Sequence, residues 1–167
     1  SKTVKRQILR KIMISLFPKL FLFLRRLNYK HNVLPKKFVQ HVRRLSKNDV
    51  VIDIGANIGL VSELLARRGA RVISFEPNTS AFAKLKLVAD KFRNIETYNV
   101  AVGSKNQKVK LYLHRDSDLV KEDLTQASSL LKNKPNLSQE IFEEIQEIDF
   151  AEFLRSLNTR IELIKID

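Results

Sequence analysis

The sequence predicts an α/β fold in which helices cover a doubly wound, mostly parallel sheet. Two observations lead to this prediction. Short apolar runs rich in β-branched residues recur along the chain, and the first two are each followed by a turn and then by apolar residues at helical spacing. Alternating strands and helices favour parallel pairing, because each helix carries the chain back across the sheet before the next strand begins.

The first part of that pattern alternates three helices with two strands. A helix with apolar residues from Phe38 to Leu45 precedes an apolar run typical of a strand buried on both faces. The elements expected next, in chain order, are a strand at 50–54, a helix starting at 60 and capped by Gly69, a strand at 71–75, a turn at 76–79 and a helix over 82–92.

The second part of the pattern is less regular. A third strand is expected at 95–100, an alternating half-exposed strand at 108–113, a polar loop at 115–136 and a last buried strand at 161–166. The stretch 141–157 fits either one helix or a short strand followed by a helix capped by Asp149. We favour the strand and capped helix.

The charge divides the chain into two parts. Its 167 residues are 44% hydrophobic and include no cysteine, which excludes disulfides, thiolate metal sites and cysteine nucleophiles. Residues 1–49 hold 14 of the 31 Lys and Arg and only one of the 18 acids, so they carry a charge of +13, equal to that of the whole chain. We therefore expect a basic helical segment over residues 1–45 and an electrically balanced α/β domain over residues 46–167.

The basic segment alternates basic and apolar residues, which predicts one or two amphipathic helices hinged at Pro18. The apolar run from Ile12 to Leu24 is too short and too interrupted for a membrane span, and no signal-peptide cleavage site follows it. Either these helices pack on the domain as a cap, or residues 1–30 contact an anionic membrane surface. We expect a cytoplasmic protein. If residues 1–30 contact the membrane, we expect it to be peripheral at that membrane.

The residues that point to a ligand follow the first two strands. A motif runs from Asp53 to Gly59, in which Gly55 to Gly59 form a tight glycine turn, and Glu76 ends the next strand. Such a turn lets a ligand approach the backbone closely, and an acid about twenty residues later can accept both hydroxyls of a ribose. A dinucleotide fingerprint would need glycine where Asn57 and Leu60 stand, and the Gly-Lys-Ser/Thr ending of a phosphate loop is absent. S-adenosylmethionine has no phosphate, and Asp53 suits its ammonium group.

Several linked motifs make the sequence resemble the FkbM family of S-adenosylmethionine-dependent class I methyltransferases. They are Val51 to Gly59 (VIDIGANIG), Phe75 to Asn78, Asn99 to Gly103, Ser128 to Leu130 and Leu163 to Asp167. The resemblance covers residues 45–167 and implies a Rossmann-like domain. In the family the last motif continues into Val-Glu-Gly, so we expect that C-terminal strands are missing after Asp167 and that this chain alone is inactive as a fragment.

The resemblance implies S-adenosylmethionine as cofactor and O-methylation of a hydroxyl on a glycan or small metabolite. Glu76 would hold the ribose, the glycine turn the methionine side, and the stretch after Asn99 the adenine. The expected cofactor-binding residues are Asp53, Gly55, Ala56, Asn57, Gly59, Glu76, Pro77, Asn99 and Ala101. Asp167 is the candidate catalytic residue, which either orients a substrate hydroxyl or simply ends a strand.

Two other functions stay open. The domain could bind NAD or a nucleotide sugar, or the chain could be a non-catalytic protein that binds polyanions or membranes through residues 1–49. His31, His41 and His114 lie in unrelated contexts, so no metal site is expected. No specific contact with nucleic acid is expected either.

Overall fold

The computed structural model describes residues 34–112 and 142–167. The expected amphipathic helices, the loop at 115–136 and the Ser128 to Leu130 motif therefore lie outside the described residues. The chain divides into two compact units, Ser1–Arg44 and Leu45–Asp167. In the first unit the structure describes the helix α3, Lys36–Arg44, where a helix was expected. No helix in the described part of the chain is both long and apolar enough to cross a membrane.

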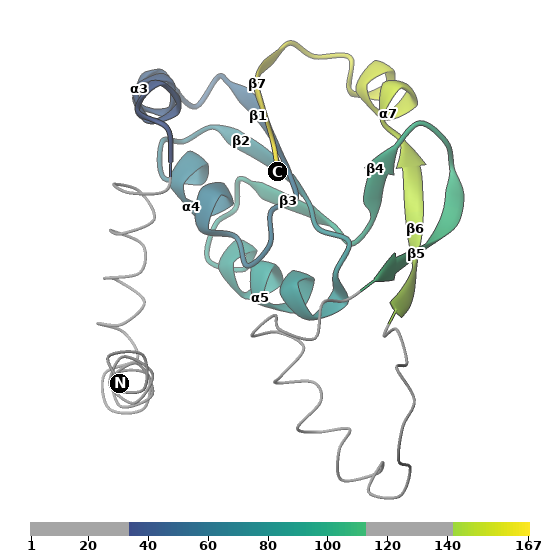
Figure 1. Ribbon diagram of the computed structural model, residues 1–167. Helices are drawn as coiled ribbons and strands as arrows, with labels where there is room; N and C mark the ends of the chain where they lie inside the picture. Colours follow the sequence, from purple (N-terminus) through teal and green to yellow (C-terminus); the bar gives the residue numbers. More distant parts are fainter. Residues whose placement is uncertain (1–33, 113–141) are drawn as a thin grey trace, which may run out of the picture. The chain divides into compact units, whose positions relative to one another are not determined.

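The main sheet of the second unit has four parallel strands in the order β3-β2-β1-β7 (Figure 1). They are β1 Val50–Ile54, β2 Arg71–Phe75, β3 Ile95–Tyr98 and β7 Ile161–Ile166. The chain adds β2 and β3 on one side of β1 and then returns to place β7 on the other side. This confirms the doubly wound parallel sheet, and its strand order reverses between β1 and β7, where ligands of such sheets bind.

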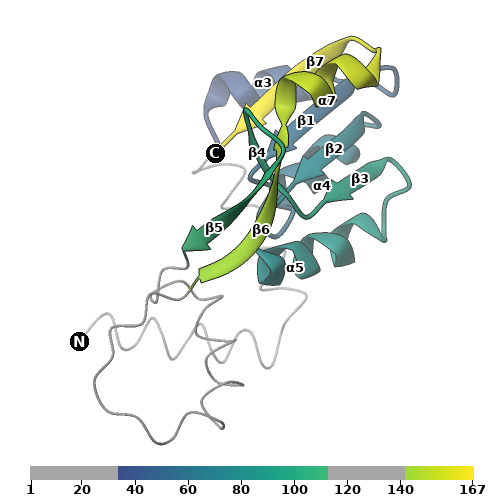
Figure 2. The same ribbon diagram turned by 90° about the vertical axis from the view of Figure 1, so that its right-hand side faces the viewer.

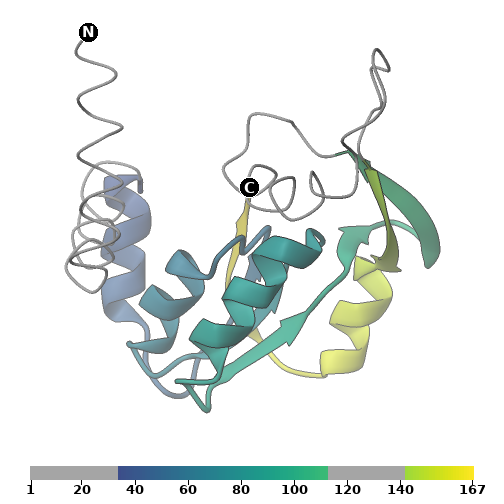
Figure 3. The same ribbon diagram turned by 90° about the horizontal axis from the view of Figure 1, so that it is seen from below.

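Helices cover both faces of this sheet. The helices α4, Leu60–Ala66, and α5, Thr79–Ala89, lie side by side, and α7, Phe150–Leu157, lies apart from them (Figure 3). On the α7 face, Ile52, Ile73 and Phe75 form a buried cluster to which Phe150 and Phe153 add their rings. Because side chains alternate along a strand, the residues between them point to the α4 side.

Two helices begin at side-chain caps. The Asn78 side chain accepts a hydrogen bond from the N–H of Ala81 at 2.8 Å, and that of Asp149 accepts one from Glu152 at 3.0 Å. The second cap separates the strand β6, Phe142–Asp149, from α7. The interpretation of 141–157 as a strand and a capped helix is thereby confirmed, with a longer strand than expected.

A second sheet of three strands was not predicted. It has the order β4-β6-β5, with β5 Gln107–Tyr112 antiparallel to β6 and β4 Ala101–Gly103 parallel to it (Figure 2). The strand expected at 108–113 is confirmed as β5. The three residues of β4 are too few to show a periodicity, so this strand could not be recognised from the sequence.

Candidate functional site

A row of polar side chains crosses the main sheet one position before each strand ends. In the pairing register, Asp53 of β1 lies opposite both Lys165 of β7 and Ser74 of β2, and Ser74 lies opposite Thr97 of β3. Aligned residues of adjacent strands share a face of the sheet. This face is the one that α4 covers, since the Ser62 hydroxyl of α4 reaches Asp53 and Ser74.

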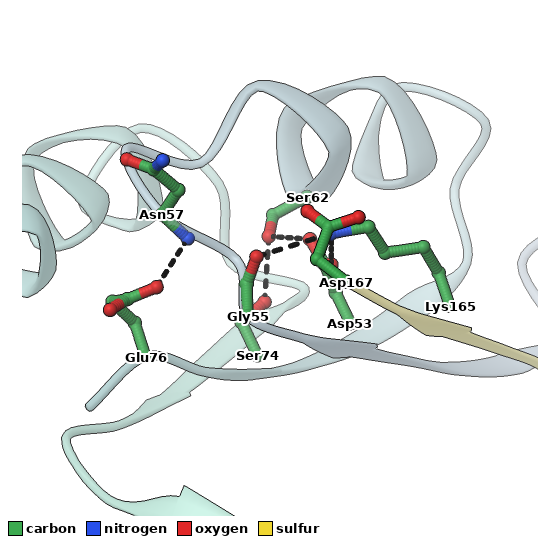
Figure 4. Close-up of polar contacts among 8 residues, drawn as sticks. All are labelled: Asp53, Gly55, Asn57, Ser62, Ser74, Glu76, Lys165 and Asp167. Atoms are coloured by element: carbon green, nitrogen blue, oxygen red, sulfur yellow. Dashed lines mark hydrogen bonds and ion pairs between the residues drawn. The ribbon is translucent and has the colours of Figure 1, made fainter. Parts of the chain in front are cut away.

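Asp53 is fully buried within this row (Figure 4). Its Oδ2 accepts a hydrogen bond from the Ser62 hydroxyl at 2.7 Å, and that hydroxyl lies 2.9 Å from the Ser74 hydroxyl. Its Oδ1 lies 3.1 Å from the Nζ of Lys165, whose side chain is 10% exposed. Burial raises the pKa of Asp53 above its ordinary value, while the charge of Lys165 and the bond from Ser62 act in the opposite direction.

Asp53 has a cation beside it from the chain itself. We expected the ammonium group of S-adenosylmethionine at this position, and the structure places Lys165 of the same chain next to Asp53. Both carboxylate oxygens of Asp53 face groups of the protein, because the side chain is fully buried. We expected no role for Lys165, although a lysine inside an apolar strand is a sign of a buried charge that needs a partner.

The glycine turn uses its own N–H groups internally. Gly55, Asn57 and Gly59 have φ values of 73°, 52° and 86°. The N–H groups of Gly55 and Ala56 both donate to the Phe75 carbonyl, at 3.0 and 2.9 Å, and that of Gly59 donates to the Ala56 carbonyl at 2.9 Å. A phosphate-binding turn presents such groups to its ligand, so this turn suits a ligand without phosphate.

The two outer glycines of the turn have different neighbours. A Cβ at Gly55 would lie 3.3 Å from the Cβ of Asp167, at the end of β7. A Cβ at Gly59 would lie 3.0 Å from the Cδ1 of Leu85 and 3.3 Å from the Cβ of Val88, both in α5. Gly59 therefore permits close packing of the turn on α5, and Gly55 permits close packing on β7.

Glu76 stands at the carboxyl end of β2, beside the turn. Its Oε2 accepts from the N–H of Asn57 at 2.7 Å and its Oε1 from the N–H of Asn78 at 2.8 Å. Burial raises the pKa of Glu76, and these two N–H groups act in the opposite direction. Since each carboxylate oxygen has two acceptor positions, each oxygen can accept one further hydrogen bond.

Asn99 supports the backbone that carries Glu76. Its side-chain amide donates to the carbonyls of Glu76 and Pro77, at 2.8 and 3.1 Å. Ala101 belongs instead to β4 of the second sheet, where it pairs with Glu147. The structure thus brings Asn99 and Pro77 to the Glu76 turn and places Ala101 in the neighbouring sheet.

Asp167 follows β7 and is the most exposed acid of the site, with 59% of its side chain exposed. Its N–H donates to the carbonyl of Ile54 at 3.2 Å, and its Oδ2 lies 2.5 Å from the Nζ of Lys165. Burial lowers the pKa of Lys165, but attraction by Asp53 and Asp167 outweighs burial, so the pKa stays above its ordinary value. The described residues contain no cluster of three or more His, Asp or Glu that could hold a metal ion.

The residues present suit S-adenosylmethionine rather than a dinucleotide. Glu76 offers two oxygens that can accept hydrogen bonds from hydroxyl groups, and the N–H groups of Gly55, Ala56, Asn57 and Gly59 in the adjacent turn already donate to the protein. Gly55 and Gly59 keep the turn free of side chains where it meets β7 and α5. A ligand with a ribose and no phosphate matches this set of donors and acceptors.

Comparisons with known proteins agree with this geometry. The chain is 43% identical over 68 residues to the ubiquinone biosynthesis O-methyltransferase of Bradyrhizobium diazoefficiens, covering 40% of this chain and 27% of that protein. It is 40% identical over 63 residues to the ribosomal RNA small subunit methyltransferase A of Thermotoga petrophila, covering 38% of this chain and 24% of that protein. The matched part thus spans about a quarter of the length of these curated relatives.

Among solved structures, the chain is similar to TYW2 of P. horikoshii in complex with MeSAdo. The TM-score is 0.36 and the identity 13%, over 66% of this chain and 60% of that chain. The model of the methyltransferase FkbM domain matches residues 53–167, which is more than half of the chain. The chain therefore belongs to the FkbM methyltransferase domain family, whose cofactor is S-adenosylmethionine.

Proposed function

We propose that this chain forms the cofactor-binding part of an enzyme that transfers a methyl group from S-adenosylmethionine to a hydroxyl group. The observation that carries this proposal is the setting of Glu76. Its two oxygens, each with an acceptor position left, lie beside a glycine turn in which the N–H groups of Gly55, Ala56, Asn57 and Gly59 donate to the protein. Family membership supplies the reaction type.

Each part of the site has its own task in this proposal. Glu76 accepts hydrogen bonds from the two ribose hydroxyls, and Asn99 holds the Glu76 backbone in place. The turn from Gly55 to Gly59 lies along the methionine side. When bound, S-adenosylmethionine supplies an electrophilic methyl group on its sulfonium, and the chain contributes mainly by holding cofactor and acceptor in line.

Asp167 is the residue we propose to face the acceptor. Its carboxylate is exposed and lies at the end of β7, against Gly55 of the turn. There it can accept a hydrogen bond from the acceptor hydroxyl and take up its proton as the oxygen is methylated.

The acceptor we propose is a hydroxyl of a glycan or small metabolite. The resemblance to the FkbM family points to this class, and the O-methyltransferase among the relatives supports attack by oxygen. NAD and nucleotide sugars remain the alternative ligands, and the internally bonded turn argues against both because each contains a pyrophosphate.

The experiment has two stages. Calorimetric titration with S-adenosylmethionine and, separately, with NAD identifies the ligand, and we expect heat of binding from the first alone. Methyl-labelled cofactor is then supplied with a panel of glycans and small hydroxylated metabolites. Label that survives mild alkali in the product indicates a methyl ether, whereas an ester would release it. Binding of NAD without S-adenosylmethionine would refute the proposal.

We also propose that residues 1–30 hold the protein at an anionic membrane surface within the cytoplasm. The charge of +13 concentrated in residues 1–49 supports this contact. Co-sedimentation with vesicles containing phosphatidylserine tests it. Binding that disappears on deletion of residues 1–30 and falls as salt rises is expected, and binding that persists after the deletion would rule it out.

A further inference from the structure

Lys165 is a buried cation with more contacts than charge neutralisation requires. It stands in β7, directly opposite Asp53 in the register with β1, and its side chain is only 10% exposed. A lysine in this position is expected to pair with Asp53, because an isolated buried carboxylate is strongly unfavourable. One contact would be enough for that purpose.

Three oxygens from three places in the fold surround the Nζ of Lys165 (Figure 4). The Oδ1 of Asp53 lies at 3.1 Å, the carbonyl oxygen of Gly55 at 3.1 Å and the Oδ2 of Asp167 at 2.5 Å. The ammonium group donates hydrogen bonds to Gly55 and Asp167 and forms an ion pair with Asp53. Lys165 thereby connects the end of β1, the first residue of the glycine turn and the end of β7.

The turn and the end of β7 are already close without the lysine. A Cβ at Gly55 would lie 3.3 Å from that of Asp167, and the N–H of Asp167 donates to the carbonyl of Ile54. The backbone contact fixes where the two chain segments meet. It does not fix the direction of the Gly55 carbonyl or of the Asp167 carboxylate, and Lys165 contacts both of these groups.

We propose that Lys165 is a positioning residue that holds the glycine turn and the carboxylate of Asp167 in one fixed arrangement. Asp53, Ser62 and Ser74 form the buried support from which the lysine extends. The consequence for cofactor affinity rests on the proposed function, since it assumes that the turn lies along the cofactor. The effect on the turn itself does not depend on that assumption.

The decisive variant removes both buried charges together. Lys165→Met leaves the Asp53 charge without a partner and is expected to destabilise the fold, so by itself it reports charge neutralisation. Lys165→Met combined with Asp53→Asn removes the unpaired charge and should regain most of the lost stability. Faster amide exchange in the turn or weaker cofactor binding that persists in the double variant is then caused by loss of the contacts that position the turn.

Two measurements on the double variant test the proposal. Amide hydrogen exchange at Ala56 and Asn57 should be about tenfold faster than in the wild type, because one bond that holds the turn is gone. The dissociation constant for S-adenosylmethionine should rise by about the same factor. Arg71→Met combined with Glu96→Gln is the matched control, since this pair also joins two strands but is exposed, and it should change neither quantity.

Each result separates the inference from the proposed function. Wild-type exchange at Ala56 and Asn57 in the double variant would overturn the inference and limit Lys165 to neutralising Asp53. Faster exchange supports it even if the wild type fails to bind S-adenosylmethionine, in which case the proposed function alone is refuted.

Discussion

Asp53 and Glu76 are acids at the ends of two neighbouring parallel strands. Asp53 comes just before the end of β1, and Glu76 comes just after the end of β2. Their surroundings differ. Asp53 faces a lysine and a serine inside the sheet, whereas Glu76 accepts two backbone N–H groups at the start of the next turn. Both side chains are buried, Asp53 fully and Glu76 with 6% exposed, so the difference lies in their partners: the two backbone donors leave one acceptor position on each oxygen of Glu76. We infer from this difference that Asp53 supports the site from within, and we propose Glu76 as the acid that meets a ligand.

The largest effect is expected from Lys165→Met. Removing one partner of a buried ion pair leaves the other charge uncompensated, which lowers the free energy of unfolding by about 3–5 kcal/mol. Unfolding in urea, followed by circular dichroism, measures this loss. Arg71→Met is the control, because the side chains of Arg71 and Glu96 are 44% and 41% exposed and such pairs contribute about 1 kcal/mol or less. Equal losses in the two variants would contradict the assignment of Asp53 to the interior.

The loss in Lys165→Met should shrink in acid. Burial already raises the pKa of Asp53 above its ordinary value of 3.8, and removal of Lys165 takes away an influence that lowers it. A carboxyl whose pKa is raised by folding destabilises the fold when ionised, and this penalty disappears as the pH falls through the folded-state pKa. The difference in unfolding free energy between wild type and variant should therefore decrease between pH 7 and pH 4. A difference independent of pH would show that Asp53 is not the group left unpaired.

Gly55→Ala tests the contact between the glycine turn and Asp167. Gly55 has a φ of 73°, and the added methyl group would lie 3.3 Å from the Cβ of Asp167. We expect a loss of about 1–2 kcal/mol in stability together with weaker binding of S-adenosylmethionine. Gly69→Ala is the control, since Gly69 has a φ of 91° but its added methyl group would meet only ordinary contacts with Lys47. A comparable loss of cofactor affinity in both variants would mean that backbone strain alone explains the effect.

Asn99→Ala should give the smallest change in this series. It removes two hydrogen bonds to the backbone carbonyls of Glu76 and Pro77. The expected loss is about 1 kcal/mol in stability, with a few-fold rise in the dissociation constant for S-adenosylmethionine. Thermal unfolding and calorimetry measure the two values. A change in stability without a change in affinity for S-adenosylmethionine would show that Asn99 does not influence how Glu76 contacts the ligand.

The order of elements could be predicted from the sequence because it depends on local patterns. The buried strand before Gly55 and the capping Asp149 each appear within a few neighbouring residues. The helix expected over 82–92 instead runs over Thr79–Ala89, because Asn78 caps it earlier than its apolar spacing indicated. The strand β4 escaped prediction because its three residues are too short for any periodicity. Its place beside β6 depends on a contact with residues far along the chain.

The two acids show the limit of sequence reasoning at the site. A strand-end acid followed by a glycine turn predicts a ligand-binding site, but it does not show whether the acid faces the ligand or the interior. For Asp53 the answer depends on Lys165, which lies opposite it only because β7 pairs with β1 in this register. Pairing between distant strands leaves no local signal in the sequence.

A thermodynamic cycle tests most directly whether Glu76 binds the ribose. The dissociation constants of S-adenosylmethionine and its 2′-deoxy analogue are measured by calorimetry for the wild type and for Glu76→Ala. The account predicts that Glu76→Ala weakens binding of S-adenosylmethionine by about 1–3 kcal/mol, and that the wild type discriminates against the analogue while the variant does not. If both proteins discriminate equally against the 2′-deoxy analogue, Glu76 does not contact that hydroxyl and its assignment to the ribose is wrong.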